Sequence, residues 1–346
     1  MKNTGSLLRT FSGKFFPVSG SRFPVLGYPG NHHLWPDLIR ISVAMILLNS
    51  PITGILGQTD YSWWNEKHNW DGVSDWTDYL IITPAFLGPN ALPVPELKNG
   101  CLSSDTQFEL GTEGHYSVGD QTINLHTDLY LPLFTDRAAL QITYRPVEWY
   151  QTDTITRDLR RSREYDPSGL SFGDFYVGTY IQLIKGHPSL PDLLLSANIK
   201  TASGTNLAGA RHTDSPGYWF DATFSKHFAP ANPSLKSIRL YAKGGFYCYQ
   251  NYGNSHFQND AFLYGAGISF NLKKLSIQNQ VTGFIGYFNR GDKPMVYRLI
   301  IEGTGNTTVS FRAVFQQGLN DFDFTSLRLS ALVRLNRIFS KLSVTH

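Results

Sequence analysis

The sequence of 346 residues is weakly charged: only 16% of its residues are Asp, Glu, Lys or Arg, and the formal net charge is +3. So small a charge, without a run of basic residues, argues against a nucleic-acid-binding protein. Aromatic residues make up 14%, and the 31 glycines and 18 prolines favour strands and turns. The two cysteines, Cys101 and Cys248, are too few for a disulfide framework or a Cys-x-x-Cys metal site. We expect two free thiols, with one bridge between them as the alternative.

An apolar run at 41–57 has the layout of a secretory signal peptide. Arg40 precedes the run, and Gly57 ends it before polar residues. Pro51 would break a buried core helix, and the run is shorter than the ~20 apolar residues of a membrane-spanning helix. We therefore predict that residues 1–57 form a leader with a signal peptide. A start of translation further downstream would explain the long stretch before the run.

The region that follows lacks a regular period. Four tryptophans and four prolines are spread over 61–100. We predict that 58–105 is an irregular, periplasmic N-terminal segment. A short basic cluster at 157–164 also contains Asp158 and Glu164 and is expected to be a solvated loop.

From residue 106 onward, apolar and polar residues alternate with the period of β-strands. Most of the alternating segments exceed the roughly five to six residues of globular strands and match the roughly 9–11 residues of tilted membrane-spanning strands. No amphipathic helix interrupts them, so the sequence predicts an all-β fold, an antiparallel transmembrane β-barrel of about twelve strands over 106–339, with a C-terminal tail at 340–346. The twelve segments are 106–118, 121–134, 138–150, 172–185, 191–203, 217–228, 237–250, 259–271, 274–288, 295–305, 307–317 and 325–337.

The connections between these segments support the barrel. Odd-numbered connections tend to be long and even-numbered ones short, apart from a short first connection and a rather long turn at 229–236. Barrels with both termini in the periplasm have long outer loops and short periplasmic turns in this alternation.

The last segment shows how the two faces differ. Leu327, Leu329 and Leu335 share one parity, whereas Arg328 and Arg334 share the other. In a membrane the leucines would face lipid and the arginines a polar interior. A soluble β-sandwich with its apolar side inward is the alternative. Aromatic residues near segment ends favour the membrane, where they form interfacial girdles: Trp149, Tyr150, Tyr218, Trp219, Phe228, Tyr287 and Phe288.

The parity of each segment predicts which charged residues line the lumen. The cations could attract anionic solutes through a narrow pore, or could pair with the anions and fill the interior. These two interpretations stay open. The predicted inward set is Arg145, Lys200, Arg239, Lys243, Arg298, Arg312, Arg328 and Arg334, with Glu109, Glu113, Asp128, Asp174, Asp221 and Glu302.

The sequence gives only weak support for catalytic or metal-binding residues. His115 and Ser117 have the spacing of a histidine and serine in an outer-membrane phospholipase, but the surroundings differ, and a polar pair near a turn is the better interpretation. His126 and Asp128 share the inward face of one segment, which is too few ligands for a metal site. His212 is expected in a mobile outer loop. We predict no catalytic residues, no cofactor and no metal, and therefore not an enzyme.

The sequence resembles outer-membrane β-barrels of Gram-negative bacteria in its leader, its strand count and its final segment "LRLSALVRLNRIF", which ends in the aromatic Phe339. Residues 173–204 and the following "HTDSPGYWFDATFSKHF" resemble the meta-pathway phenol-degradation family of proposed outer-membrane transporters. Residues 88–100 are similar to a segment preceding barrels of Bacteroidetes type. The resemblance implies an outer-membrane location, with lipids and the barrel-assembly machinery as partners.

The predicted function is a passive channel or porin-like transporter for small solutes. The alternatives are a closed barrel with a structural or adhesive role and a membrane-embedded lipid hydrolase.

Overall fold

The computed structural model describes residues 60–84, 86–133, 136–251, 258–286, 292–304, 307–336 and 338. The chain divides into two compact units, Met1–Leu47 and Leu48–His346, and every described residue belongs to the second. The predicted signal peptide, the girdle residues Tyr287 and Phe288, and Phe339 with the tail lie outside the described residues. Among the described residues, no helix is long and apolar enough to cross a membrane.

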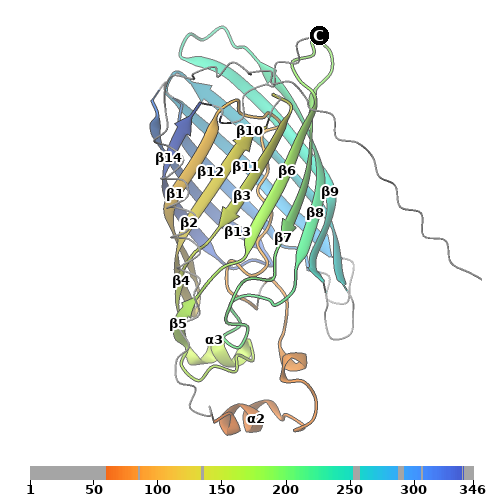
Figure 1. Cartoon of the computed structure of the whole chain (residues 1–346), viewed down its shortest axis with the longest axis vertical. Helices are drawn as coiled ribbons and strands as arrows, with labels where there is room; N and C mark the ends of the chain where they lie inside the picture. The colour runs from red at the N-terminus through yellow and green to blue at the C-terminus, as the bar shows by residue number, and fades with distance from the viewer. Residues whose placement is uncertain are drawn as a thin grey trace, which may run out of the picture. The chain divides into compact units, whose positions relative to one another are not determined.

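Fourteen antiparallel strands form one sheet, and its ends meet because β1 pairs with both β2 and β14 (Figure 1). Two strands, β4 and β5, form a side branch on β2, and the other twelve close into a barrel. The prediction of a twelve-stranded antiparallel barrel is confirmed. The strands are β1 Thr106–Ser117, β2 Asp120–Pro132, β3 Ala138–Tyr144, β4 Glu148–Thr152, β5 Ser168–Ser171, β6 Phe175–Ile184, β7 Asp192–Lys200, β8 Gly217–Phe228, β9 Leu235–Asn251, β10 Gln258–Leu272, β11 Leu275–Gly286, β12 Met295–Gly303, β13 Val309–Asn320 and β14 Thr325–Leu335.

The predicted third segment, 138–150, is two strands rather than one. β3 pairs with β6, whereas β4 leaves the barrel wall and pairs with β5. The break falls at 145–147, where Pro146 has no N–H to donate to a ladder. β2 spans the break by pairing with β3 at one end and with β4 at the other.

Apolar side chains cover the outside of the barrel. On β14, Leu327 and Leu329 are 49% and 57% exposed, whereas Arg328 between them is 6% exposed. Phe220 and Phe224 on β8 and Phe311 and Phe315 on β13 also point outward. The parity inferred from the sequence is therefore the parity of the barrel, and the alternative with apolar side chains inward is wrong.

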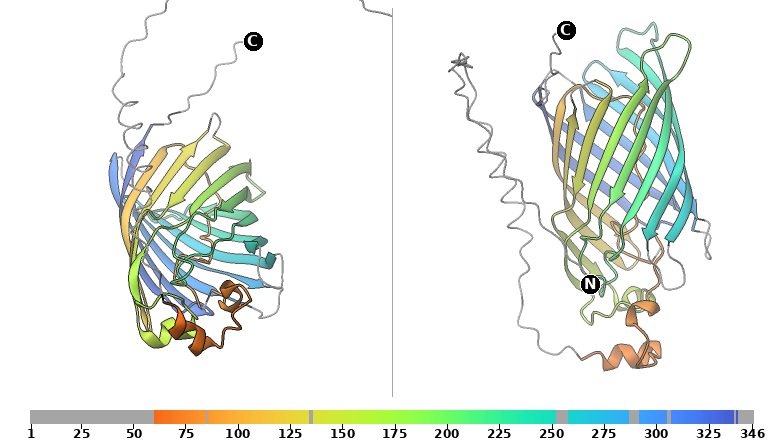
Figure 2. Two further views of the ribbon diagram at one scale, coloured as in Figure 1. Left: turned by 60° about the horizontal axis from the view of Figure 1, so that its bottom comes forward. Right: turned by 45° about the vertical axis from the view of Figure 1, so that its right-hand side comes forward.

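The two mouths of the barrel differ. At one mouth lie the start of β1, the end of β14 and short connections such as 185–191 and 273–274. At the other lie the long connections 145–174 and 201–216. The helices α2 (Ser62–His68), η1 (Trp76–Tyr79) and α3 (Thr154–Leu159) lie at this long-connection mouth (Figure 2).

A segment of the chain passes through the barrel interior (Figure 1). Residues 86–105, here called the strap, run from the long-connection mouth to the start of β1 at the opposite mouth. The barrel therefore encloses part of its own chain.

Candidate functional site: an interior filled by the strap

The strap is an extended chain whose backbone is bonded to inward side chains. The amide of Leu97 donates to Gln280 Oε1 at 2.9 Å, and the amide of Leu102 donates to Gln182 Oε1 at 3.1 Å. Gln182 in turn donates to the carbonyl of Gly100 at 3.0 Å. Three of the first ten strap residues are prolines, which carry no N–H and so leave fewer donors to satisfy away from water. The interior thus provides polar partners for a chain without secondary structure.

The half of the strap nearer the long-connection mouth packs into an apolar cluster. Leu87 and Leu92 are fully or almost fully buried there. The rings of Tyr247 and Phe284 meet edge to face at a centroid distance of 5.0 Å. Burying one leucine side chain contributes about 1.5–3 kcal/mol, so this cluster anchors the strap. Its members are Leu87, Ala91, Leu92, Val94, Ala210, Tyr247, Tyr249, Ala261, Leu263, Phe284, Val296, Phe322 and Phe324.

The next part of the strap meets positively charged side chains. Glu96 Oε1 lies 2.8 Å from Arg312 Nη2, and Glu96 Oε2 lies 3.6 Å from Arg328 Nη2. Arg298 Nη2 donates to the carbonyl of Val94 at 2.5 Å. From β9, three strands further along the sheet from β12, Lys243 Nζ donates to the carbonyl of Glu96 at 3.1 Å. Three neighbouring strands, β12, β13 and β14, each supply one of the arginines.

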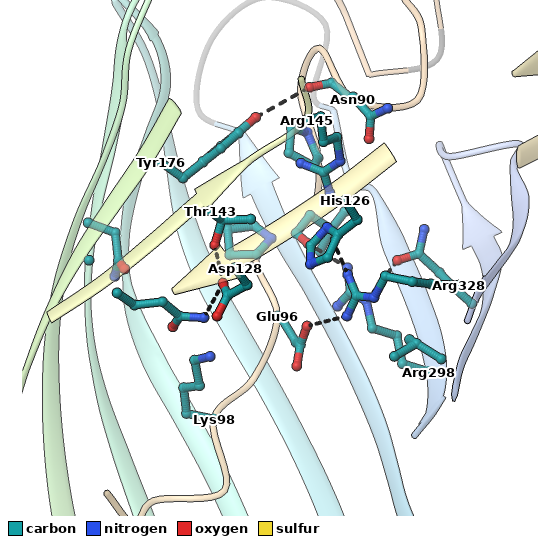
Figure 3. A pocket seen from close by; sticks show the side chains of 18 of the residues that line it. Asn90, Glu96, Lys98, His126, Asp128, Thr143, Arg145, Tyr176, Arg298 and Arg328 are labelled. Carbon is teal, nitrogen blue, oxygen red and sulfur yellow. Dashed lines mark hydrogen bonds and ion pairs between the residues drawn. The ribbon is translucent and has the colours of Figure 1, made fainter. Parts of the chain in front are cut away.

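A cavity of about 150 Å³ remains beside the strap (Figure 3). Glu96 points across it toward the arginines, Asp128 and Tyr176 face it from β2 and β6, and Arg145 faces it from the break after β3. Of the residues predicted to line the lumen, the following border the cavity: Glu109, Glu113, Asp128, Arg145, Asp221, Arg298, Arg312 and Arg328. This space accommodates a few water molecules or a small solute and is smaller than the roughly 300–1,000 Å³ of drug-sized ligand pockets.

The other predicted lumen residues do not border this cavity, and each of them forms an ion pair. Lys200 pairs with Asp174 at 2.8 Å, and Arg334 pairs with Glu302 at 2.6 Å. Arg239 pairs with Asp192 at 2.7 Å, a partner that the parity analysis did not include. Lys243 lies 4.0 Å from Asp221.

A buried ionic cluster lies near the long-connection mouth, and the sequence analysis did not predict it. Arg211 is fully buried, and its Nη1 lies 2.7 Å from Asp120 Oδ2 while its Nε donates to Glu148 Oε1 at 2.9 Å. Arg160 shares the same Asp120 oxygen at 2.5 Å. A Cβ at Gly88 of the strap would lie 2.7 Å from Arg211 Cζ, so only glycine fits there without a shift. Arg211 lies in the connection between β7 and β8, which has a polar sequence. The alternation of apolar and polar residues that predicts strands therefore gave no indication that Arg211 is buried.

His212 belongs to this cluster and is not part of a mobile loop. It is 1% exposed, with Glu148 and Asp174 carboxylates each 3.8 Å from a ring nitrogen. Burial lowers the pKa of the imidazole below 6.5, although these two carboxylates act in the opposite direction. The expectation of a mobile loop at His212 is wrong because the connection 201–216 folds back over the cluster.

The basic cluster at 157–164 is packed rather than solvated. Arg157 and Arg160 are 8% and 5% exposed. The guanidinium of Arg163 lies 4.0 Å from the ring centroid of Tyr61, and Trp64 Nε1 donates to the carbonyl of Arg161 at 3.0 Å. A guanidinium group stacked on an aromatic ring is attracted to the face of that ring. These contacts join the helices α2 and α3 at the long-connection mouth, so the expectation of a solvated loop is wrong.

His115 does not contact Ser117. Its Nδ1 lies 2.7 Å from Ser326 Oγ, and its Nε2 lies 2.8 Å from Asn124 Oδ1. All three residues are buried. His126 lies 3.8 Å from Glu109, whereas Asp128 accepts from Gln141 and Thr143. Across the described ranges, no group of three or more His, Cys, Asp or Glu side chains is placed to hold a metal ion. Cys101 and Cys248 are free thiols, as expected.

No protein-family model matches the chain, so the resemblance to the meta-pathway phenol-degradation family stays a prediction. No curated protein matches it either. Among solved structures, an outer membrane channel from Pseudomonas putida F1 is similar at 12% identity and a TM-score of 0.49, with 70% of this chain and 100% of that chain covered. The NanC porin is similar at 8% identity and a TM-score of 0.43, with coverages of 66% and 100%. The β domain of the Bordetella autotransporter BrkA is similar at 10% identity and a TM-score of 0.41, with coverages of 68% and 100%. These likenesses are too low to indicate a function, which must be inferred from the barrel's own interior.

Proposed function

We propose that this protein is an outer-membrane channel for small, preferentially anionic solutes, held closed by its own strap. The observation that carries the proposal is the placement of Arg298, Arg312 and Arg328 on the interior of a closed barrel, beside a cavity and against the strap. A bore lined with arginines favours anions, because the fixed positive charge offsets part of the cost of removing water from them.

The outer surface supports a location in a lipid bilayer. Leu327, Leu329, Phe220 and Phe311 are each about half exposed, on strands that pair with a neighbour on both sides around the closed ring. A large apolar surface on a soluble protein would be costly, whereas in lipid it is favourable. An outer membrane is the bilayer in which closed barrels of this kind are found. Lipids and the barrel-assembly machinery are the partners that this location implies.

The orientation follows from the connections. In outer-membrane barrels the short turns face the periplasm and the long loops face outward. The long-connection mouth, with α2 and α3, would then face outward, and so would residues 60–80. The sequence predicted a periplasmic position for 58–105; under this proposal, only the end of the strap near Thr106 lies on that side.

Conductance in a planar bilayer tests the proposal. Purified full-length protein should give small, infrequent current steps, because the strap fills most of the bore. Glu96→Gln should give more frequent steps, since it removes the charge that holds the strap to Arg312 and Arg328. Asp174→Asn is the matched control, because Asp174 pairs with Lys200 and neither residue lines the cavity beside the strap. A complete absence of current in the wild type and in Glu96→Gln would refute the channel.

A closed barrel with a structural or adhesive role is the second candidate, and the apolar anchor of the strap favours it. The two candidates differ in one outcome. A strap that never leaves the bore predicts no current in Glu96→Gln, and also none after loss of an apolar anchor such as Leu92.

The lipid-hydrolase alternative has one supporting observation. Ser326, His115 and Asn124 form a hydrogen-bonded chain in the order of nucleophile, base and orienting group. However, Ser326 is 3% exposed and faces the interior, where no acyl chain reaches it. The chain of bonds instead connects β14, β1 and β2. Hydrolysis of a phospholipid that is abolished by Ser326→Ala would reverse this assignment.

A further inference from the structure

We propose that Arg312 and Arg328 form a binding site for the carboxylate group of a permeating solute, and that Glu96 of the strap occupies this site in the closed state. The inference rests on the proposed channel and deepens it by naming the chemical group that the bore recognises.

The two arginines form ion pairs with two carboxylates, one fixed on the barrel wall and one on the strap, which the proposal takes to be removable. Glu109 on β1 is the fixed one: its Oε2 lies 3.3 Å from Arg312 Nη1, and its Oε1 lies 3.2 Å from Arg328 Nε. Glu96 is the removable one, and it meets the Nη2 atom of each arginine. Glu109 therefore holds both guanidinium groups in position while their Nη2 atoms face the space that the Glu96 carboxylate fills.

Removing the strap would take one negative charge away from this site. Arg312 and Arg328 would lose the Glu96 carboxylate, and Arg298 would lose the carbonyl of Val94. The site would then hold more positive charge than its remaining carboxylates balance, which is unfavourable for buried guanidinium groups. Within the cavity lining, Glu109 would be the nearest remaining counter-ion to both arginines. An incoming carboxylate would replace Glu96 atom for atom, and a planar carboxylate suits guanidinium donors.

The surroundings limit the solute further. The same cavity is lined by the aromatic side chains of Tyr176, Tyr180, Trp219 and Phe322, which would contact an apolar body. While the strap is in place, the volume of about 150 Å³ admits only a small body. Glu109 and Glu113 would repel a second negative charge, so the site favours monocarboxylates over dianions. A small aromatic or branched aliphatic monocarboxylate fits these conditions.

Binding by the full-length protein in detergent tests the site independently of conduction. The probes are sodium benzoate and sodium acetate, compared with sodium chloride and sodium sulfate at equal ionic strength. In Glu96→Ala, benzoate should raise the Tm and quench the fluorescence of Trp219, whereas the wild type should respond at concentrations at least tenfold higher. Adding Arg312→Gln to Glu96→Ala should abolish the response. Asp174→Asn is the matched control, because Asp174 pairs with Lys200 and does not line the cavity, and it should respond as the wild type does.

Equal responses of Glu96→Ala and the wild type would overturn the site, as would a response that survives Arg312→Gln. If Glu96→Ala folds poorly, the isosteric Glu96→Gln gives the same comparison. The bilayer separates this inference from the proposed function. Current through Glu96→Gln with no preference for benzoate over chloride overturns the carboxylate site and leaves the channel. Benzoate binding without current in any variant overturns permeation, and with it the role assigned here.

Discussion

The carboxylate of Glu96 lies 2.8 Å from the guanidinium of Arg312, although the two residues are 216 positions apart in the sequence. The contact joins the strap to the barrel wall at the point where the bore carries most positive charge. Under the proposed function, the state of the channel depends on this one segment, and its contacts with the wall can be weakened by substitutions that change no strand.

The apolar cluster around Leu92 should hold the strap in the bore as strongly as the ion pair between Glu96 and Arg312 does. Leu92→Ala removes a side chain that is 1% exposed, and large-to-small changes in a packed core cost about 2–5 kcal/mol. We expect a lower free energy of unfolding and more frequent current steps. Val73→Ala, at a side chain that is 90% exposed, is the control and should change neither quantity. Unchanged gating in Leu92→Ala would show that the strap is not held by this cluster.

Under the proposed orientation residues 60–80 face outward, and labelling of intact cells tests this. A cysteine at Glu66, which is exposed on α2, should react with a membrane-impermeant maleimide. A cysteine at Ser234, exposed in a short connection, should react only after the outer membrane is permeabilised. The wild type gives the background from Cys101 and Cys248. The opposite pattern would place the long-connection mouth in the periplasm and support the position predicted from the sequence for 58–105.

The buried cluster around Arg211 should contribute to stability. Arg211→Met leaves the carboxylates of Asp120 and Glu148 with fewer partners, and breaking a buried pair from one side costs about 3–5 kcal/mol. Lys185→Met, at an exposed pair with Asp136, should cost less than about 1 kcal/mol. Chemical unfolding in detergent measures both. Equal effects of the two substitutions would contradict the energetic role of the Arg211 cluster.

His212 should make stability depend on pH. Burial holds the pKa of the folded-state imidazole below its ordinary value of 6.5, so the unfolded chain binds a proton that the folded chain does not. This contribution is fully present above pH 6.5 and is lost as the pH falls from there toward the folded pKa. His212→Gln, which does not titrate, should lose less stability than the wild type between pH 7 and pH 5. Parallel Tm curves for the two proteins would show that His212 is not buried as a neutral ring.

Local periodicity was sufficient to place the strands. The segment 217–228 coincides with β8, and most other boundaries differ by a few residues. The third segment is the exception, because Pro146 stops one ladder and lets the following residues pair with a different neighbour. The period of two also identified which charged side chains point inward, although it could not say which of them meet.

The candidate site was only partly visible in the sequence. Arg312 and Arg328 were predicted to face the interior, but Glu96 lies in a segment without a period and was not connected with them. Leu263 and Phe284 point inward although they are apolar, which does not fit a polar lumen. The structure explains their position, because both belong to the apolar cluster that includes residues of the strap. The ionic cluster of Arg211 and Asp120 likewise joins a loop to a strand far away in the sequence.

The sequence by itself determined the class of fold, because a side chain's parity along a strand depends only on its own neighbours in the chain. Only the tertiary structure decided what fills the barrel. The course of residues 86–105 is set by contacts with side chains from β6, β9, β11, β12 and β13, which are brought together when the sheet closes. No local pattern encodes such contacts, because their energy arises from packing and charge pairing across the interior.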